Sequence, residues 1–139
     1  MKAVVQRVSR AAVRVEGETL AAIGPGLVVL LGIGHDDSAA TAERLAEKVR
    51  ALRIFAGADG RMNEPLGARE VLCVSQFTLY ADTARGNRPS FTAAAAPELA
   101  ARLYERFCEL LGAAQGRFGA HMEVEMTGDG PVTILLEVT

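Results

Sequence analysis

An unbroken apolar run over residues 27–33, with a single glycine inside it, restricts the fold of this chain more than any other feature. The turn-forming residues Gly24-Pro25-Gly26 precede the run, and the polar residues His35 and Asp36 follow it. A run of this length without a polar side chain predicts a β-strand that is buried on both faces. It is much shorter than the ~20 apolar residues that a membrane-spanning helix needs, so we expect no membrane partner.

Alternation of apolar and polar residues predicts further strands at both ends of the chain. Near the amino terminus, residues 3–9 are strand-like, and the chain returns over residues 19–23 after a turn. Near the carboxyl terminus, residues 122–126 and 132–138 alternate on either side of Gly128-Asp129-Gly130-Pro131. Because glycine and proline favour turns, this pattern predicts a terminal β-hairpin.

Two segments have the apolar spacing of amphipathic helices. The first follows Asp36, Asp37 and Ser38, whose side chains suit a helix start. The second runs from Pro97, a favoured first residue, to Gly112, a favoured stop. Their apolar positions are Leu45, Val49 and Leu52 in the first helix, and Leu99, Leu103, Phe107 and Leu110 in the second.

The order of these elements predicts one α+β domain over residues 1–139. Residues 55–69 and 81–90 contain glycine and proline and are expected to be loops, whereas residues 71–75 are expected to form a short strand. The whole is a curved, mostly antiparallel, barrel-like sheet of about seven strands that two helices cover.

Charge and cysteine content narrow the class of protein. The net charge of -2 argues against a polybasic nucleic-acid binder, although it leaves room for a local basic patch. Arginines interrupt every apolar stretch near the amino terminus, so we expect no signal peptide and a soluble protein inside the cell. Cys73 and Cys108 form neither a CxxC pair nor a disulfide framework, and we expect two reduced, buried thiols.

Familiar metal and cofactor motifs do not appear in the sequence, and we expect neither group. His35 has no neighbouring ligands in the sequence. His121, Glu123 and Glu125 share one face of a predicted strand, where a solvated outer face is favoured over a ligand cluster. Gly32-x-Gly34-x-x-Asp37 lacks the third glycine of a dinucleotide fingerprint, and neither a Walker lysine nor a GxSxG elbow is present.

Two segments stand out as candidate sites. Ser75-Gln76-Phe77-Thr78-Leu79 follows a short apolar strand, whose end can hold hydroxyl and amide groups rigidly at a rim. The same polar side chains can instead serve only to satisfy the strand end. Gly128-Asp129-Gly130-Pro131 reads as an ordinary hairpin turn, and the sequence does not decide whether the Gly130–Pro131 bond is cis or trans.

Several segments, spread over the chain, match one known pattern. They are Gln6-Arg7-Val8, Val15-Glu16-Gly17, Arg53-Ile54-Phe55, Ser75-Gln76-Phe77-Thr78-Leu79, Gly86-Asn87-Arg88-Pro89-Ser90-Phe91, Gly116-Arg117-Phe118-Gly119-Ala120-x-Met122 and Gly130-Pro131-Val132-Thr133. In this order, from the first residue to the last, they resemble the bacterial D-aminoacyl-tRNA deacylase family. Any one of these motifs is weak, but together they are specific.

The resemblance implies a cytoplasmic homodimer that hydrolyses the ester between a D-amino acid, or mischarged glycine, and the 3′ end of tRNA. The implied partner is aminoacyl-tRNA, without DNA. Gly130 and Pro131, joined by a cis bond, would enter the partner subunit's pocket and exclude L-amino acids. The residues implied to form the aminoacyl pocket are Ser75, Gln76, Phe77 and Thr78.

Further roles follow from the same resemblance. Arg7 would steady the Gly-Pro loop, and Arg88-Pro89-Ser90-Phe91 would bind the tRNA end. The 2′-hydroxyl of the terminal ribose would help to activate water, because Thr78 has no base beside it in the sequence. Backbone N–H groups near Phe77 and Thr78 would form an oxyanion hole.

The chain departs from the family pattern in two places. Gly128 stands where an asparagine is usual, which predicts a looser gate, and the loop over residues 63–69 is shorter than usual. Two other functions stay open: a hydrolase of small esters that uses Thr78 directly, and a dimeric binding module without activity. The sequence does not determine the preferred D-amino acid or tRNA.

Overall fold

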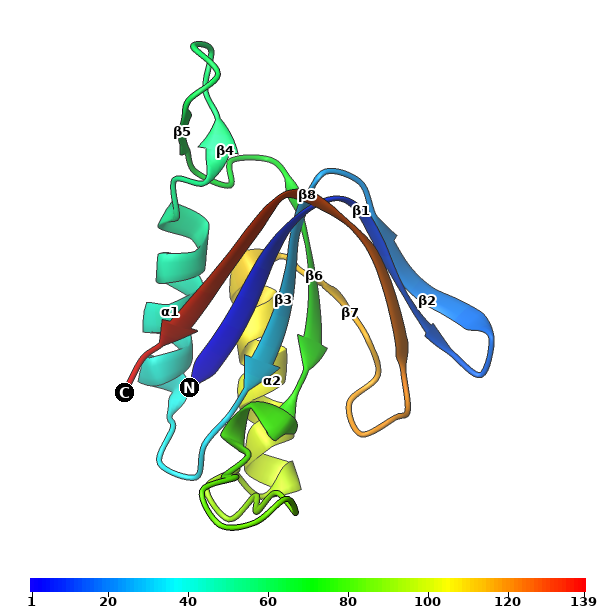
Figure 1. The fold of residues 1–139 in the computed structure, drawn as a ribbon, viewed down its shortest axis with the longest axis vertical. Coiled ribbons are helices and arrows are strands. Elements are labelled where there is room, and N and C mark those ends of the chain that lie inside the picture. Colours follow the sequence, from blue (N-terminus) through cyan, green and yellow to red (C-terminus); the bar gives the residue numbers. More distant parts are fainter.

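The computed structural model describes residues 1–139 and shows a mixed six-stranded sheet that curls toward a barrel (Figure 1). β1 pairs antiparallel with β2, β3 and β8, whereas the pairs β3–β6 and β6–β7 are parallel. The elements are β1 (Lys2–Val15), β2 (Glu18–Ile23), β3 (Gly26–Gly32), α1 (Ala39–Ala51), β4 (Phe55–Ala56), β5 (Met62–Glu64), β6 (Glu70–Ser75), η1 (Phe77–Tyr80), α2 (Pro97–Leu111), β7 (Ala114–Gln115) and β8 (Glu123–Glu137). The predicted α+β class, with two helices covering a curved sheet, is confirmed.

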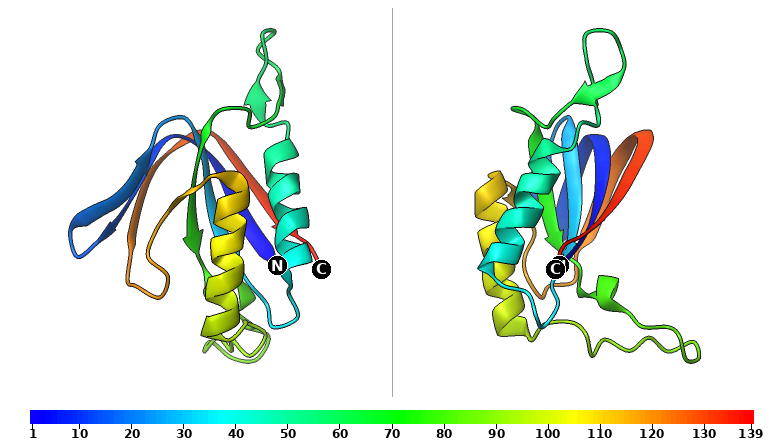
Figure 2. Two further views of the ribbon diagram at one scale, coloured as in Figure 1. Left: turned by 180° about the vertical axis from the view of Figure 1, so that it is seen from behind. Right: turned by 90° about the vertical axis from the view of Figure 1, so that its left-hand side faces the viewer.

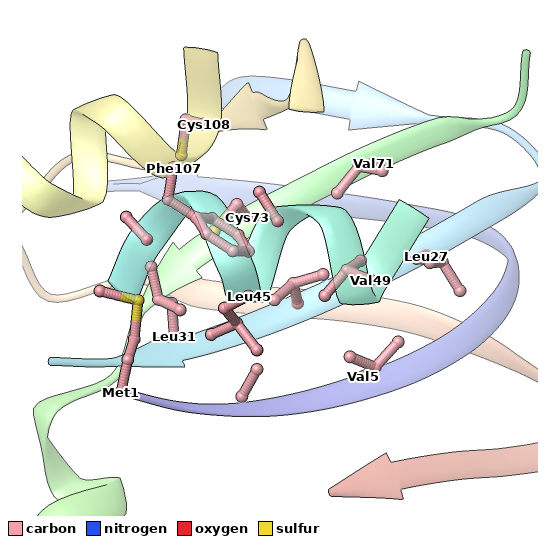
Figure 3. Close-up of a cluster of buried hydrophobic side chains, with 14 of the residues drawn as sticks. Met1, Val5, Leu27, Leu31, Leu45, Val49, Val71, Cys73, Phe107 and Cys108 are labelled. Atoms are coloured by element: carbon pink, nitrogen blue, oxygen red, sulfur yellow. The ribbon is translucent and has the colours of Figure 1, made fainter. Parts of the chain in front are cut away.

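β3 is the strand that the apolar run predicts, and both of its faces are buried. On one face, Leu27, Val29 and Leu31 pack with the helices in the larger core (Figure 3). On the other face, Val28 packs with Val8, which β1 brings round as the sheet curls. The curl therefore supplies the second cover that an all-apolar strand needs.

The start of α1 and the end of α2 lie at residues that favour those boundaries. Before α1, the Ser38 hydroxyl accepts from the Thr41 N–H and the Thr41 hydroxyl accepts from the Ser38 N–H, so two free donors gain partners. After α2, Gly112 adopts a left-handed conformation with φ 62°, which ends the helix. The two helices lie on the same side of the sheet (Figure 2). Neither has the length and apolar sequence that a membrane crossing requires.

The prediction of a terminal β-hairpin is wrong. The chain does not turn back but continues as one long strand, β8, which pairs antiparallel with β1 in both of its halves. Between the pair Val8–Gly128 and the pair Gln6–Thr133, the chain of β8 bulges outward opposite Arg7. Glycine and proline suit a bulge as well as a turn, and alternation of side chains does not reveal whether a strand reverses.

The two predicted loops differ in outcome. Residues 55–69 hold the small two-stranded sheet β4–β5, so the loop prediction is wrong in part. Gly60 lies between these strands with φ 78°, a conformation that glycine adopts most readily. Residues 81–90 contain no helix or strand, as predicted, and extend away from the body of the molecule (Figure 2).

Candidate functional site

A cavity of about 590 Å³ opens beside the carboxyl end of β6. Much of its lining is apolar. Leu31 and Val74 of the sheet, Ile33 just after β3 and Pro97 at the start of α2 belong to it. Its polar and aromatic lining residues are Ser75, Gln76, Phe77, Phe91, Phe118 and His121. A mostly apolar cavity with a few polar groups on a rigid rim is typical of a site for a small ligand.

The rim forms because β6 ends at Ser75 and the chain turns at once into η1. The Gln76 N–H donates to the Leu31 carbonyl at 2.7 Å, which ties the turn to β3. Phe77, which follows, is 58% exposed and meets Phe91 edge to face, with ring centroids 5.0 Å apart. The pair, an exposed Phe77 on a half-buried Phe91, offers ring faces beside the cavity on which a base or an aromatic side chain can stack.

The structure brings together part of the predicted site. The predicted residues that line the cavity are Ser75, Gln76, Phe77 and Phe91. Thr78 is exposed and outside the lining, and the Gln76 side-chain amide donates to its hydroxyl. Arg88, Pro89 and Ser90 are exposed on the segment that extends from the body and are not in the lining. The roles of all these residues stay predictions.

Residues 128–131, which we call the gate segment, do not line the cavity of their own chain. The Gly130–Pro131 peptide bond is cis. Arg7 of β1 holds the segment: its Nε donates to the Asp129 carbonyl at 3.1 Å and lies 3.2 Å from the Asp129 carboxylate. Its Nη1 donates to the Ile54 carbonyl at 2.6 Å. The guanidinium group thus ties the gate segment to a second part of the backbone, while the gating role stays a prediction.

His121 and Phe118 are cavity residues that the residue patterns did not place there. β8 begins at Glu123, so His121 precedes the strand and the period of two does not apply to it. The predicted solvated face is correct for His121, Glu123 and Glu125, which are all exposed, but His121 also lines the cavity. The motif over residues 116–122, quoted for the family resemblance, was the one signal that pointed to this segment.

Cys73 of β6 and Cys108 of α2 are free and buried, as the sequence predicts. Burial raises the pKa of the Cys73 thiol, so it stays protonated near neutral pH. The Tyr104 hydroxyl donates to the Cys73 carbonyl at 2.7 Å and so ties α2 to the strand that ends at Ser75. Nowhere do three or more His, Cys, Asp or Glu side chains lie together in an arrangement that could hold a metal ion.

Comparison with known sequences gives matches over nearly the whole chain. A family model described as D-Tyr-tRNA(Tyr) deacylase matches residues 4–137. A protein of Symbiobacterium thermophilum named D-aminoacyl-tRNA deacylase is 54% identical over an alignment that covers 99% of this chain and 95% of that protein. The match to this relative therefore extends over nearly the full length of both chains.

Solved structures share the fold. One described as "c-Myc DNA Unwinding Element Binding Protein" has a TM-score of 0.93 at 44% identity and covers 99% of this chain and 98% of that one. A probable eukaryotic D-amino acid tRNA deacylase has a TM-score of 0.84 at 16% identity over 97% of each chain, and it shows the fold alone. With a family match over most of its length and a relative above half identity, the chain belongs to the D-Tyr-tRNA(Tyr) deacylase family.

Proposed function

We propose that the protein hydrolyses the ester bond between a D-amino acid and the 3′ end of tRNA, releasing both in the cytoplasm. One observation carries the proposal: Ser75, Gln76 and Phe77, from the motif that resembles the family's pocket, line a cavity at a rigid strand end. Mischarged glycyl-tRNA is a further proposed substrate, because glycine has no side chain that a gate against L-amino acids can reject.

The cavity suits the aminoacyl end of tRNA in size and in chemistry. Its volume of about 590 Å³ lies within the usual range of small-ligand sites. The Ser75 hydroxyl and the Gln76 amide are uncharged groups that donate and accept, which suits an amino group and an ester carbonyl. Phe77 and Phe91 offer ring faces for the terminal adenine or for an aromatic side chain.

A second copy of the chain would complete the site. Gly130 and Pro131 are exposed on the bulge of β8 and do not line the cavity of their own chain. In the homodimer that we propose, the gate segment enters the cavity of the partner subunit, where its backbone fills the space that an L side chain needs. Arg7 bonds to two backbone carbonyls and so defines the place of the gate segment before the partner binds.

The RNA itself would assist the hydrolysis. Thr78 is poorly suited as a nucleophile, because its hydroxyl pairs with the Gln76 amide, a group that does not take up a proton at neutral pH. The 2′-hydroxyl of the terminal ribose would help to activate a water molecule. The water oxygen adds to the carbonyl carbon, the ester C–O bond breaks, and the departing 3′-oxygen takes up a proton. Backbone N–H groups of Phe77 and Thr78, at the start of η1, would stabilise the oxyanion.

Exposed arginines offer contacts to the phosphates of the acceptor end. Arg85 and Arg88 flank Asn87 on the extended segment, and this segment leads to Phe91 in the cavity lining. A small basic patch is enough where only the end of the tRNA is bound, which is compatible with a net charge of -2.

The test is deacylation of matched D-Tyr-tRNA and L-Tyr-tRNA by the purified protein with a chelator present. We expect rapid loss of the D ester and little loss of the L ester. Loss of both esters would contradict the gate and favour a general esterase. Loss of neither would contradict hydrolysis and favour a binding module, and DNA would then be the first ligand to try, given the name of one structural relative.

A further inference from the structure

The motif Gly32-x-Gly34-x-x-Asp37, which fails as a dinucleotide fingerprint, has another place in the structure. Its two glycines lie at the carboxyl end of β3, and η1 packs directly on them. A Cβ at Gly32 would come within 2.9 Å of the Leu79 Cβ, and a Cβ at Gly34 within 2.9 Å of the Tyr80 hydroxyl oxygen. Neither glycine has a positive φ. The close contact therefore depends on the absence of a side chain, and not on the backbone freedom of glycine.

Asp37, the last residue of the motif, contacts Tyr80 at the end of η1. Its side chain is only 7% exposed, and its Oδ1 is paired with the amino-terminal ammonium group of Met1 at 2.7 Å. Its Oδ2 accepts from the Gly34 N–H at 2.7 Å and from the Tyr80 hydroxyl at 3.5 Å. The Lys2 ammonium group lies 4.7 Å from the centroid of the Tyr80 ring. One carboxylate therefore joins β1, the loop after β3 and the end of η1.

Tyr80 is thus contacted by glycine backbone at the ring, by Asp37 at the hydroxyl and by Lys2 over the ring face. Burial, followed by the charge of Asp37, raises the pKa of Tyr80, so the hydroxyl keeps the proton that it donates. Tyr80 is the last residue of η1, a helix of 4 residues that begins at Phe77. In so short a helix, a shift at one end moves the other end as well.

The residues of this contact, which we call the seat, are Gly32, Gly34, Asp37 and Tyr80. We propose that the seat positions Gln76 and Phe77 in the cavity and contacts no substrate atom itself. The inference rests on the proposed function, because it takes Gln76 and Phe77 as substrate-binding groups. No seat residue lines the cavity, so its effect on the reaction passes through η1. Misplacing a binding group by about 1 Å can lower a rate ~100-fold.

The test measures single-turnover hydrolysis of D-Tyr-tRNA at saturating enzyme, together with Tm. Gly34→Ala adds a methyl group where the Tyr80 ring lies, and we expect the rate constant to fall about tenfold or more. Gly24→Ala is the matched control, since its Cβ would meet only the flexible Glu70 carboxylate, at 3.5 Å. A loss of stability lowers Tm and the folded fraction. The smaller folded fraction raises the enzyme concentration needed for saturation, but it leaves the rate constant at saturation unchanged. The readout therefore separates mispositioning from unfolding.

Variants of Tyr80 test the seat in a second way. They remove atoms instead of adding a methyl group, so they give a result even if Gly34→Ala does not fold. We expect Tyr80→Ala to lower the rate constant about tenfold. Tyr80→Phe is expected to keep it within about threefold, because the ring makes the close contacts and the bond from the hydroxyl is long. The double variant Gly34→Ala/Tyr80→Ala should be no slower than Tyr80→Ala alone, since the added methyl group then meets no ring.

Gln76→Ala, measured in the same assay, distinguishes failure of the seat from failure of the proposed site. If Gln76→Ala hydrolyses D-Tyr-tRNA at the parent rate, the proposed site is wrong, and so is the proposed role of the seat. If Gln76→Ala is slow while Tyr80→Ala matches Gly24→Ala, the site stands and the seat is overturned. A slow rate constant at saturation for Tyr80→Ala, with a near-parent rate constant for Tyr80→Phe, supports the seat.

Discussion

The segment over residues 75–80 and the gate segment serve one proposed reaction but are built in opposite ways. The first packs on the end of β3 and contributes to the cavity of its own chain. The second bulges from β8 into solvent, is held by Arg7, and contributes nothing to that cavity. The first lies at the cavity of one chain, whereas the second would act, in the homodimer that we propose, only on the cavity of another copy.

In the proposed function, this difference would separate substrate binding from selection against L-amino acids. Changes in Gln76 or Phe77 should slow hydrolysis, because in the proposed function these residues bind the aminoacyl end of the tRNA. Changes in the gate segment should alter the ratio of D to L hydrolysis and leave the D rate nearly intact. A single-chain site would show no such separation, so the four substitutions below test the comparison itself.

The largest effect is expected for Gln76→Ala. This change removes a polar group from the cavity lining, and we expect single-turnover hydrolysis of D-Tyr-tRNA to fall about 100-fold. Gln115→Ala, at an exposed position outside the lining, is the matched control. Equal rates for the two variants would remove Gln76 from the site.

A smaller effect, on selectivity, is expected for Gly130→Ala. Gly130 has φ 129°, and a Cβ there would lie 2.9 Å from the Val132 nitrogen and 3.2 Å from the Arg7 Nη2. Strain of ~2 kcal/mol would displace the gate segment and lower the D/L rate ratio about 30-fold. Gly24→Ala, outside the gate segment, is the control, because a Cβ there would meet only the Glu70 carboxylate, at 3.5 Å. If the ratio were unchanged in Gly130→Ala and the D rate fell instead, the separation of roles would be wrong.

Arg7→Lys is expected to act in the same direction but more weakly. Lysine keeps the charge but cannot reach both the Asp129 and the Ile54 carbonyls as the guanidinium fork does. Loss of one charged hydrogen bond, ~1.5 kcal/mol, should lower the D/L ratio about tenfold, measured as competing hydrolysis of the two esters. Arg10→Lys is the control and should leave the D/L ratio unchanged. The Arg10 Nε donates to the nearby Thr127 hydroxyl and not to the gate segment.

The smallest effect is expected for Thr78→Ala. Its hydroxyl only accepts from the Gln76 amide, and loss of a neutral hydrogen bond of ~0.5–1 kcal/mol corresponds to about a twofold to fivefold lower rate. The single-turnover rate constant at saturating enzyme is the measurement. Complete loss of hydrolysis in a folded variant would instead make Thr78 the nucleophile and exclude assistance by the RNA as the main source of catalysis.

The parts of the fold that the sequence predicted are those with local causes. α1 begins after Ser38 because one hydroxyl can satisfy a nearby backbone donor, and α2 ends at Gly112 because glycine adopts a left-handed conformation easily. The hairpin prediction failed at residues 128–131, where turn residues form a bulge. A period of two shows which side chains share a face, but it contains no information about the strand opposite.

In the candidate site, too, some residues were predictable from local sequence and others were not. Ser75 and Gln76 were predictable from polar side chains directly after an apolar strand, and the family resemblance strengthened that prediction. His121 was not predictable from alternation, because it precedes the strand that the alternation describes. Thr78 belongs to the same motif as Gln76 yet lies outside the lining, because η1 turns its side chain elsewhere.

By itself the sequence determined the local features of this protein: the buried strand over residues 27–33, the starts of both helices, the end of the second helix at Gly112, and the polar strand end at Ser75. Only the tertiary structure decided which distant segments meet, such as Gly34 beside Tyr80 and Arg7 opposite the gate segment. The reason is physical. Periodicity and capping act over a few residues, whereas strand pairing and close packing depend on how the whole sheet curls.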